Sequence, residues 1–234
     1  TELSRRASGP KSLAYRALLN RAVILSALGD HRTAIAVSDR ALEMAALSPE
    51  AHLVRARVLH RAGDFERAFH EIDVGLKLKS DQPGLLELRG VLLTEAGHAE
   101  EGLASLDHAI SLSPNHFAYL HKATALVALK RYEEAVRECS LALKRDPELP
   151  QAYLSRARCY VELLIWDRAL ADLEQAAAWA HGDLRLQTGV MLTYAKCLQE
   201  RPEHIRRWLL LLQRTFRLGW DVLTRTSVST GVFR

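Results

Sequence analysis

The chain has 234 residues, of which 48% are hydrophobic and 26% are charged, a composition typical of a globular protein rather than a disordered one. No apolar run approaches the roughly 18–20 residues that cross a bilayer, so no transmembrane segment is expected. The net charge of +4 is uneven, because residues 201–234 hold seven arginines against Glu203 and Asp221. A protein that grips nucleic acid along its length should be basic throughout, so nucleic acid is not the partner we expect.

The cysteines and the missing motifs argue against catalysis. Cys139, Cys159 and Cys197 cannot all pair and form no Cys-x-x-Cys motif, so we expect three buried thiols in a reducing compartment, the cytoplasm. There is no phosphate-binding glycine loop, no His-Glu-x-x-His motif and no metal-ligand cluster in the sequence. We therefore expect no enzyme activity, no catalytic residues, no metal and no cofactor.

Residues 1–12 are expected to form a flexible arm. The chain begins at Thr1 rather than at a methionine, which favours a segment of a longer or processed protein. Within the arm, Arg5-Arg6-Ala7-Ser8 is similar to a basophilic kinase site, with an inert tail as the alternative interpretation.

Residues 13–182 are expected to form five helix pairs, because a pattern of about 34 residues recurs five times. The loop glycines Gly29, Gly63 and Gly97 are 34 residues apart, within the segments ALGDHRTA, RAGDFERA and EAGHAEEG. The segments ALKRYEEA and LLIWDRAL continue the series without the glycine. With the loop glycine as position 15, the repeats begin at residues 15, 49, 83, 116 and 150.

Three positions of this repeat hold only alanine or glycine. They are Ala22, Ala56, Gly90, Ala123 and Ala157 at position 8, Ala34, Ala68, Gly102, Ala135 and Ala169 at position 20, and Ala41, Gly75, Ala109, Ala142 and Ala176 at position 27. Position 8 lies on one face of a first helix, and positions 20 and 27 lie on one face of a second helix. Small residues on both faces let two helix backbones approach closely, with large residues beside them.

This pattern resembles the tetratricopeptide repeat family, whose signature has a small residue at position 8 and alanine at positions 20 and 27. The segments Ala118–Pro147 and Ala152–Ala176 match it well. The resemblance covers Leu13–Trp179 and implies an all-α superhelix, or solenoid, of five helix pairs that binds protein partners. The departures from it are His52 at position 4, Ser38 at position 24 and Leu164 in place of the loop glycine.

Residues 183–219 are expected to form capping helices, over about 184–199 and 203–218, followed by a tail at 220–234. The second helix has an apolar stripe that includes Trp208 and Leu212. A basic patch lies largely opposite the stripe and consists of Arg206, Arg207, Arg214 and Arg217. In the alternative interpretation this helix docks on an acidic partner, a membrane surface or a second copy of the chain.

The first helices are expected to line a concave groove, with positions 5, 9 and 12 facing it. Four leucines at position 5 suggest an apolar groove for a partner peptide or helix. The alternatives are packing between repeats, or the C-terminal segment folding back into the groove. The expected groove residues are Leu19, Val23, Leu53, Arg57, His60, Arg61, Val91, Leu120, Thr124, Leu154 and Arg158.

Neither of two possible anion-binding features is expected in this chain. The chaperone-binding members of the family hold terminal carboxylates with Lys, Asn and Arg at set positions, and no three consecutive repeats here supply that set. The first three repeats give Leu19, Val23, Val54, Gly84 and Leu88. Position 7 is always basic, and its stems are expected to pack at the edge of the helix face rather than to form an anion ladder.

The sequence thus predicts a protein-interaction module that binds a partner peptide, a partner helix or another segment of its own longer chain in an apolar groove. One alternative is an adaptor whose basic C-terminal end binds RNA or anionic lipid. Another is a regulatory arm of a larger enzyme. Self-association through the C-terminal helix is a further expectation.

Overall fold

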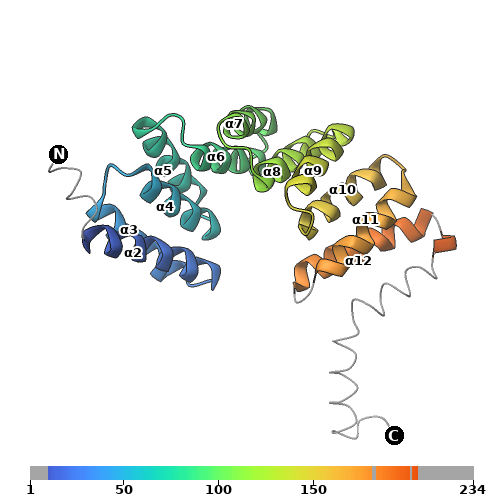
Figure 1. Ribbon diagram of the computed structural model, residues 1–234, viewed down its shortest axis with the longest axis horizontal. Helices are drawn as coiled ribbons and strands as arrows, with labels where there is room; N and C mark the ends of the chain where they lie inside the picture. The colour runs from blue at the N-terminus through green and yellow to red at the C-terminus, as the bar shows by residue number, and fades with distance from the viewer. Residues whose placement is uncertain (1–9, 181–182, 201, 205–234) are drawn as a thin grey trace, which may run out of the picture. The chain divides into compact units, whose positions relative to one another are not determined.

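A computed structural model describes residues 10–180, 183–200 and 202–204 (Figure 1). The described residues form helices and no strand, so the all-α class is confirmed. The chain divides into two compact units, Thr1–Pro114 and Asn115–Arg234, each of which holds whole helix pairs.

The first unit contains three helix pairs. They are α2 (Pro10–Ala27) with α3 (His31–Met44), α4 (Pro49–Arg61) with α5 (Phe65–Leu78), and α6 (Pro83–Glu95) with α7 (Ala99–Leu112). The first helices of the pairs are neighbours, since α4 contacts both α2 and α6. Local chemistry explains several helix starts, because Asp30, Ser48 and Asp64 accept hydrogen bonds from backbone N–H groups three residues later.

The second unit contains two pairs and a further helix. They are α8 (His116–Ala128) with α9 (Tyr132–Arg145), α10 (Pro150–Glu162) with α11 (Trp166–Trp179), then α12 (Leu184–Glu200) and the short 3-10 helix η1 (Pro202–His204). Because α10 contacts both α8 and α12, α12 takes the place of the first helix of a sixth pair. The helix expected over 184–199 is therefore confirmed, whereas the helix over 203–218 and its basic patch lie, beyond His204, outside the described residues.

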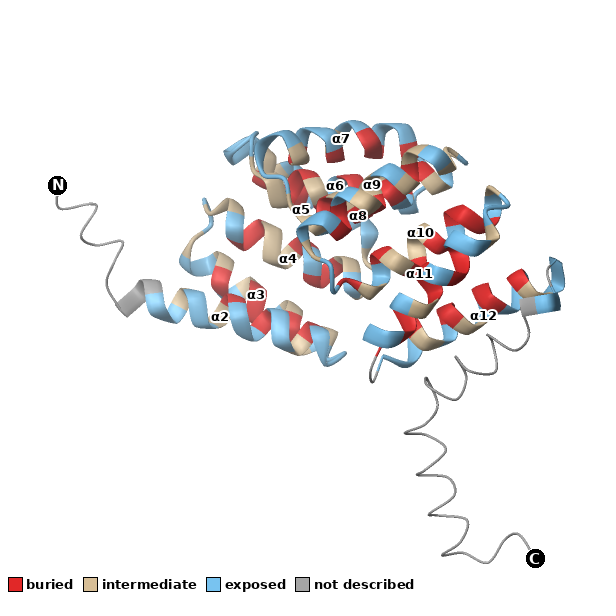
Figure 2. Ribbon diagram, turned by 45° about the vertical axis from the view of Figure 1, so that its right-hand side comes forward, coloured by how far each residue is buried: buried red, intermediate tan, exposed pale blue. Residues whose placement is uncertain are grey.

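Each pair is held by close approach at the small positions. A Cβ atom added to Gly90 would lie 2.9 Å from the carbonyl oxygen of Gly102, and one added to Gly102 would lie 2.8 Å from that of Gly90. The alanines at positions 8 and 20 in the other pairs have no exposed surface. Figure 2 shows the result in α7, whose buried residues lie on the side toward α6. Any larger side chain at these positions would push the two backbones apart.

The loops between paired helices share one backbone conformation. Gly29, Gly63 and Gly97 have φ values of +84°, +81° and +89°. Lys130 and Leu164 stand at the same position with φ values of 58° and 60°, which is the left-handed region that β-carbon-bearing residues avoid. The loops without glycine thus keep the geometry of the others and bear the strain.

The two polar departures from the family pattern are accommodated by hydrogen bonds. Ser38 is buried, and its hydroxyl donates to the carbonyl of Ile35 at 2.7 Å. His52 is buried as well, with Nδ1 at 2.7 Å from Glu71 Oε2 and Nε2 at 3.0 Å from the carbonyl oxygen of Ala46, both within hydrogen-bond distance. Neither residue leaves a gap in the fold, because each buried polar group has a partner.

The basic residue at position 7 forms an ion pair inside the repeat. Its partner is an acid at position 23, sixteen residues later, in the pairs Arg55–Glu71 (2.6 Å), Lys122–Glu138 (3.0 Å) and Arg156–Asp172 (2.7 Å). Two of these bases also reach the preceding second helix. Arg55 lies 2.8 Å from Asp39, and Arg156 donates to Ser140 at 2.9 Å. The structural interpretation of position 7 is confirmed for these three residues.

The first prediction concerns the strained loop. Leu164→Gly should raise the free energy of unfolding by about 1 kcal/mol, because glycine adopts φ near 60° without the penalty that leucine suffers. Leu164 is 67% exposed, so little apolar burial is lost. Urea denaturation measures the change. The reverse exchange, Gly63→Leu, should destabilise the protein by a similar amount, and equal stabilities for both variants and the wild type would refute the strain argument.

The second prediction concerns the position 7 ion pair. Asp172→Ala should lower the free energy of unfolding by about 2–3 kcal/mol, because it leaves the half-buried Arg156 guanidinium without its carboxylate. An arginine keeps its charge at any pH near neutrality, so neutralisation of Arg156 cannot relieve the loss. The double variant Arg156→Met/Asp172→Leu should recover much of the stability. An additive double variant would show that the two residues do not act as a pair.

Candidate functional site

The leucines at position 5 do not form an exposed stripe. Leu19, Leu120 and Leu154 are 3%, 9% and 6% exposed, and Leu53 is half-buried, so the expectation that they face an open groove is wrong. Each packs toward the next first helix instead. Leu19 shares a cluster with Ala51, Leu120 with Ala152, Leu154 with Leu186, and Leu53 lies against Gly84. Packing between repeats, the alternative interpretation, accounts for these residues.

The remaining groove residues of the first unit lie on α2, α4 and α6. Val23, Arg57 and Arg61 are exposed, whereas Val91 is half-buried. His60 is half-buried, and its Nε2 donates to Glu95 Oε2 at 2.8 Å, which ties α4 to α6. This surface is mixed in charge and only partly apolar.

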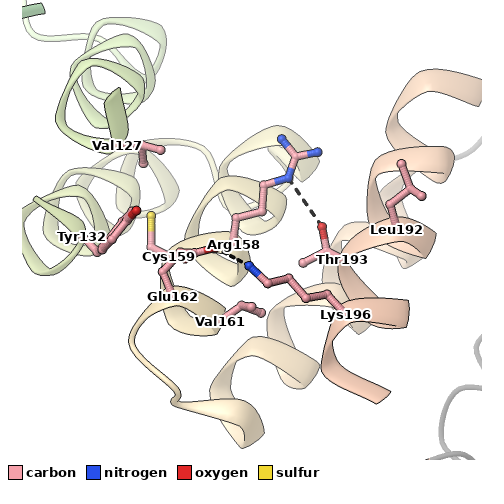
Figure 3. A pocket seen from close by; sticks show the side chains of 9 residues that line it. All are labelled: Val127, Tyr132, Arg158, Cys159, Val161, Glu162, Leu192, Thr193 and Lys196. Atoms are coloured by element: carbon pink, nitrogen blue, oxygen red, sulfur yellow. Dashed lines mark hydrogen bonds and ion pairs between the residues drawn. The ribbon is translucent and has the colours of Figure 1, made fainter. Parts of the chain in front are cut away.

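In the second unit, residues of α8, α9, α10 and α12 line an open cavity of about 350 Å³, which we call the α10–α12 cavity (Figure 3). Valines, a leucine and a tyrosine supply most of its apolar wall, and charged residues stand at its rim. The lining residues are Val127 of α8, Tyr132 of α9, Arg158, Cys159, Val161 and Glu162 of α10, and Leu192, Thr193 and Lys196 of α12. Of the expected groove residues in this unit, only Arg158 lines the cavity, because Leu120 and Leu154 are buried and Thr124 is exposed outside it.

Arg158 is held in place by α12. Its Nε donates to the Thr193 hydroxyl at 3.5 Å, and that hydroxyl donates in turn to the carbonyl of Gly189 at 2.8 Å. Gly189 leaves room for this arrangement, since a Cβ atom there would lie 3.1 Å from Arg158 Nη2 and 2.8 Å from Leu154 Cδ2. Figure 3 shows both terminal nitrogens of Arg158 pointing away from the helix that carries it.

The other two charged groups of the cavity neutralise each other. Lys196 Nζ donates to Glu162 Oε1 at 2.6 Å, and this hydrogen bond raises the pKa of the lysine. The bond joins α10 to α12 across the solvent-exposed side of the cavity (Figure 3).

The cavity also has a buried thiol in its wall. Cys159 is 1% exposed, and burial, with a smaller contribution from the charge of Glu162, raises its pKa to about 11. Cys139 and Cys197 are free and buried too, so the expectation of three buried thiols is confirmed. A neutral thiol at physiological pH is a poor nucleophile, so Cys159 acts here as part of the apolar wall.

The sequence pattern missed the contribution of α12, because the repeat was judged to lose phase after Trp179. Two signals could have found it. Tyr194 follows Tyr160 by 34 residues and is likewise buried, and Lys196 follows Glu162 by the same interval. The phase is kept at the positions that meet α10, although Met191 replaces the small residue at position 8.

The described helices offer neither a metal site nor a membrane span. No group of three or more His, Cys, Asp or Glu side chains there could hold a metal ion. None of the described helices is long and apolar enough to span a bilayer.

The sequence of the chain is similar to a known protein family and to a curated relative. The family model described as tetratricopeptide repeat matches residues 19–83 and 87–150. DnaJ homolog subfamily C member 7 homolog of Dictyostelium discoideum is 36% identical over 73 residues. The match covers 29% of this chain and only 14% of that relative's length.

Two solved structures share the fold. A thermophilic TPR protein of Thermus thermophilus is 22% identical with a TM-score of 0.69, and the match covers 77% of this chain and 99% of that one. YrrB, described as a TPR protein with an unusual peptide-binding site, is 20% identical with a TM-score of 0.53, over 76% of this chain and 95% of that one. At these identities the likeness establishes the fold alone.

The third prediction concerns the thiol in the cavity wall. In a Cys139→Ala/Cys197→Ala background, the remaining Cys159 should react with a thiol reagent at pH ~8 about 100-fold more slowly in the folded protein than in urea, since its pKa is about 11. The labelling rate should keep rising with pH until about pH 11. Glu162→Gln should accelerate labelling slightly, because a charge that raises the pKa is removed. Equal rates in folded and unfolded protein would contradict the burial of this thiol.

Proposed function

Because the chain belongs to the tetratricopeptide repeat family, we propose that it holds a segment of a protein partner against its first helices, with the α10–α12 cavity as the principal contact. Proteins of this family are protein-interaction scaffolds.

The observation that carries the proposal is the exposed apolar surface at the cavity. Leu192 is 66% exposed and lines the same cavity as Val127 and Val161. Large apolar side chains that stay exposed next to a concave, mostly apolar surface are typical of binding sites. A partner side chain that entered the cavity would cover Leu192 and gain free energy from the area removed from water.

The leucines at position 5 have a structural role rather than a binding role. Leu19, Leu53, Leu120 and Leu154 fix the spacing of successive first helices by packing between them. We propose that the contacts themselves come from exposed and half-buried neighbours. The exposed ones are Val23, Arg57 and Arg61 in the first unit and Thr124, Arg158 and Leu192 in the second, and the half-buried ones are His60 and Val91.

The proposal is for binding and not for catalysis, and the free thiols suit a reducing compartment such as the cytoplasm. The adaptor with a basic end and the regulatory arm of a larger enzyme are separate proposals. The basic patch at Arg206, Arg207, Arg214 and Arg217 lies outside the described residues, so no described contact favours the first of them. A steep loss of binding with added salt would favour it over an apolar site.

The fourth prediction tests the proposed surface. Peptides selected by the chain from a random display library should lose at least about 10-fold in affinity for Leu192→Glu, because a carboxylate would then occupy the apolar rim. The matched control is Leu141→Glu on α9. Leu141 is also an exposed leucine, with 42% of its surface accessible, but it does not line the cavity. That variant should bind within about twofold of the wild type, as fluorescence anisotropy would measure.

Neither substitution should unfold the protein, since both leucines are exposed. Circular dichroism and urea denaturation check this. If the selected peptides bind Leu192→Glu as tightly as the wild type, the α10–α12 cavity is not the binding surface.

A further inference from the structure

We infer that the α10–α12 cavity recognises an acidic side chain next to an aliphatic one in an extended peptide, with Arg158 binding the carboxylate. The inference rests on the proposed function and narrows it to one class of partner.

The Arg158 guanidinium is only partly used by hydrogen bonds within the described residues. Its Nε is used by Thr193, and within the described residues its two terminal nitrogens have no hydrogen-bond partner. A planar guanidinium with both terminal nitrogens free matches a carboxylate, which accepts two parallel hydrogen bonds from it. The side chain lies along α12 before any ligand arrives, because its Nε donates a long hydrogen bond to Thr193 at 3.5 Å and Gly189 leaves room for it.

The charged residues in the cavity lining determine which ligand charge the cavity favours. Glu162 and Lys196 are bound to each other at 2.6 Å, so Arg158 is the lining residue whose charge has no counterion among the described residues. One uncompensated positive charge beside an apolar wall attracts a single negative charge. A doubly charged phosphate fits less well, because Arg158 alone would leave one of its two negative charges without a counterion.

The size and the lining of the cavity limit what can bind in it. A volume of about 350 Å³ lies at the small end of ligand pockets, which run from roughly 300 to 1,000 Å³, and admits one or two side chains rather than a protein surface. Val127 and Leu192 offer an aliphatic side chain its contact area, and Arg158 lines the same cavity. An adjacent acidic and aliphatic pair is the shortest peptide feature that satisfies both halves of the cavity.

This site differs from the chaperone-type clamp that the sequence already argues against. That clamp needs several polar residues from three repeats, whereas this site uses one arginine and an apolar wall to which α12 contributes. It therefore calls for no free chain terminus in the partner.

The fifth prediction uses peptides as probes. Sequences enriched from a random display library by the chain should contain Asp or Glu beside Leu, Ile or Val. For one such peptide, Arg158→Gln should weaken binding about 10–100-fold, because a charge-assisted hydrogen-bond pair is lost. The same peptide with Gln in place of Glu should bind the wild type and Arg158→Gln within about twofold of each other.

Three further variants sharpen the test. Arg168→Gln removes the same charge from α11, where Arg168 lies over the Tyr160 ring, and should leave binding unchanged. Arg158→Lys should recover only part of the affinity, since an ammonium group cannot form the paired hydrogen bonds. Thr193→Val keeps the shape but removes the hydroxyl that positions Arg158, and should weaken the acidic peptide a few-fold while leaving the Gln peptide unchanged.

The outcomes separate the inference from the function on which it rests. Enriched peptides without acidic residues, or a Gln peptide that binds as tightly as the Glu peptide, would overturn the carboxylate site while the binding module stands. A phosphoserine peptide that binds more tightly than the Glu peptide would overturn it in favour of a phosphate. If no peptide is enriched, or if the enriched peptides bind Leu192→Glu as tightly as the wild type, the inference and the proposed function both fail.

Discussion

The close approach of two helices at small residues is the constraint on which this structure depends. In α6 and α7 the approach is so tight that Gly90 and Gly102 each face the other's carbonyl oxygen, with no space for a β-carbon. Buried alanines serve the same purpose in the other pairs. Once two backbones lie this close, the large residues beside them must fill the remaining volume, and the geometry of each pair is fixed.

Two further features stabilise this geometry, the loop at position 15 and the basic residue at position 7. The loop at position 15 turns the chain through a left-handed residue, and it does so even where Lys130 or Leu164 must adopt the conformation. In three repeats the base at position 7 pairs with an acid at position 23 of its own repeat, and Arg55 and Arg156 also reach position 25 of the preceding one. The turn therefore acts within a pair, whereas the contacts of Arg55 and Arg156 act both within a pair and between pairs.

The candidate site follows from this stacking. Residues of α8, α10 and α12 that are far apart in the sequence line one cavity because each helix occupies the equivalent place in its repeat. Arg158 gains its setting from Thr193 and Gly189, which lie more than thirty residues away. The exposed Leu192 and the guanidinium beside it give the cavity an apolar half and a cationic half, which is the physical basis for selecting among partners.

The sequence by itself determined the repeat, because the fifteen small positions and the 34-residue period record a contact that every pair must make. It could also have revealed the ion pairs, whose members always stand sixteen residues apart. It did not determine which residues are exposed, since that depends on the neighbouring repeat. Position 10 is 59% exposed as Ile24 and 1% exposed as Val58, which lies in one cluster with Ala34 and Val37 of the preceding helix. Only the tertiary structure decided that the leucines at position 5 are buried between repeats and that Arg158 faces a cavity, because packing between helices, and not the pattern along one helix, removes a side chain from water.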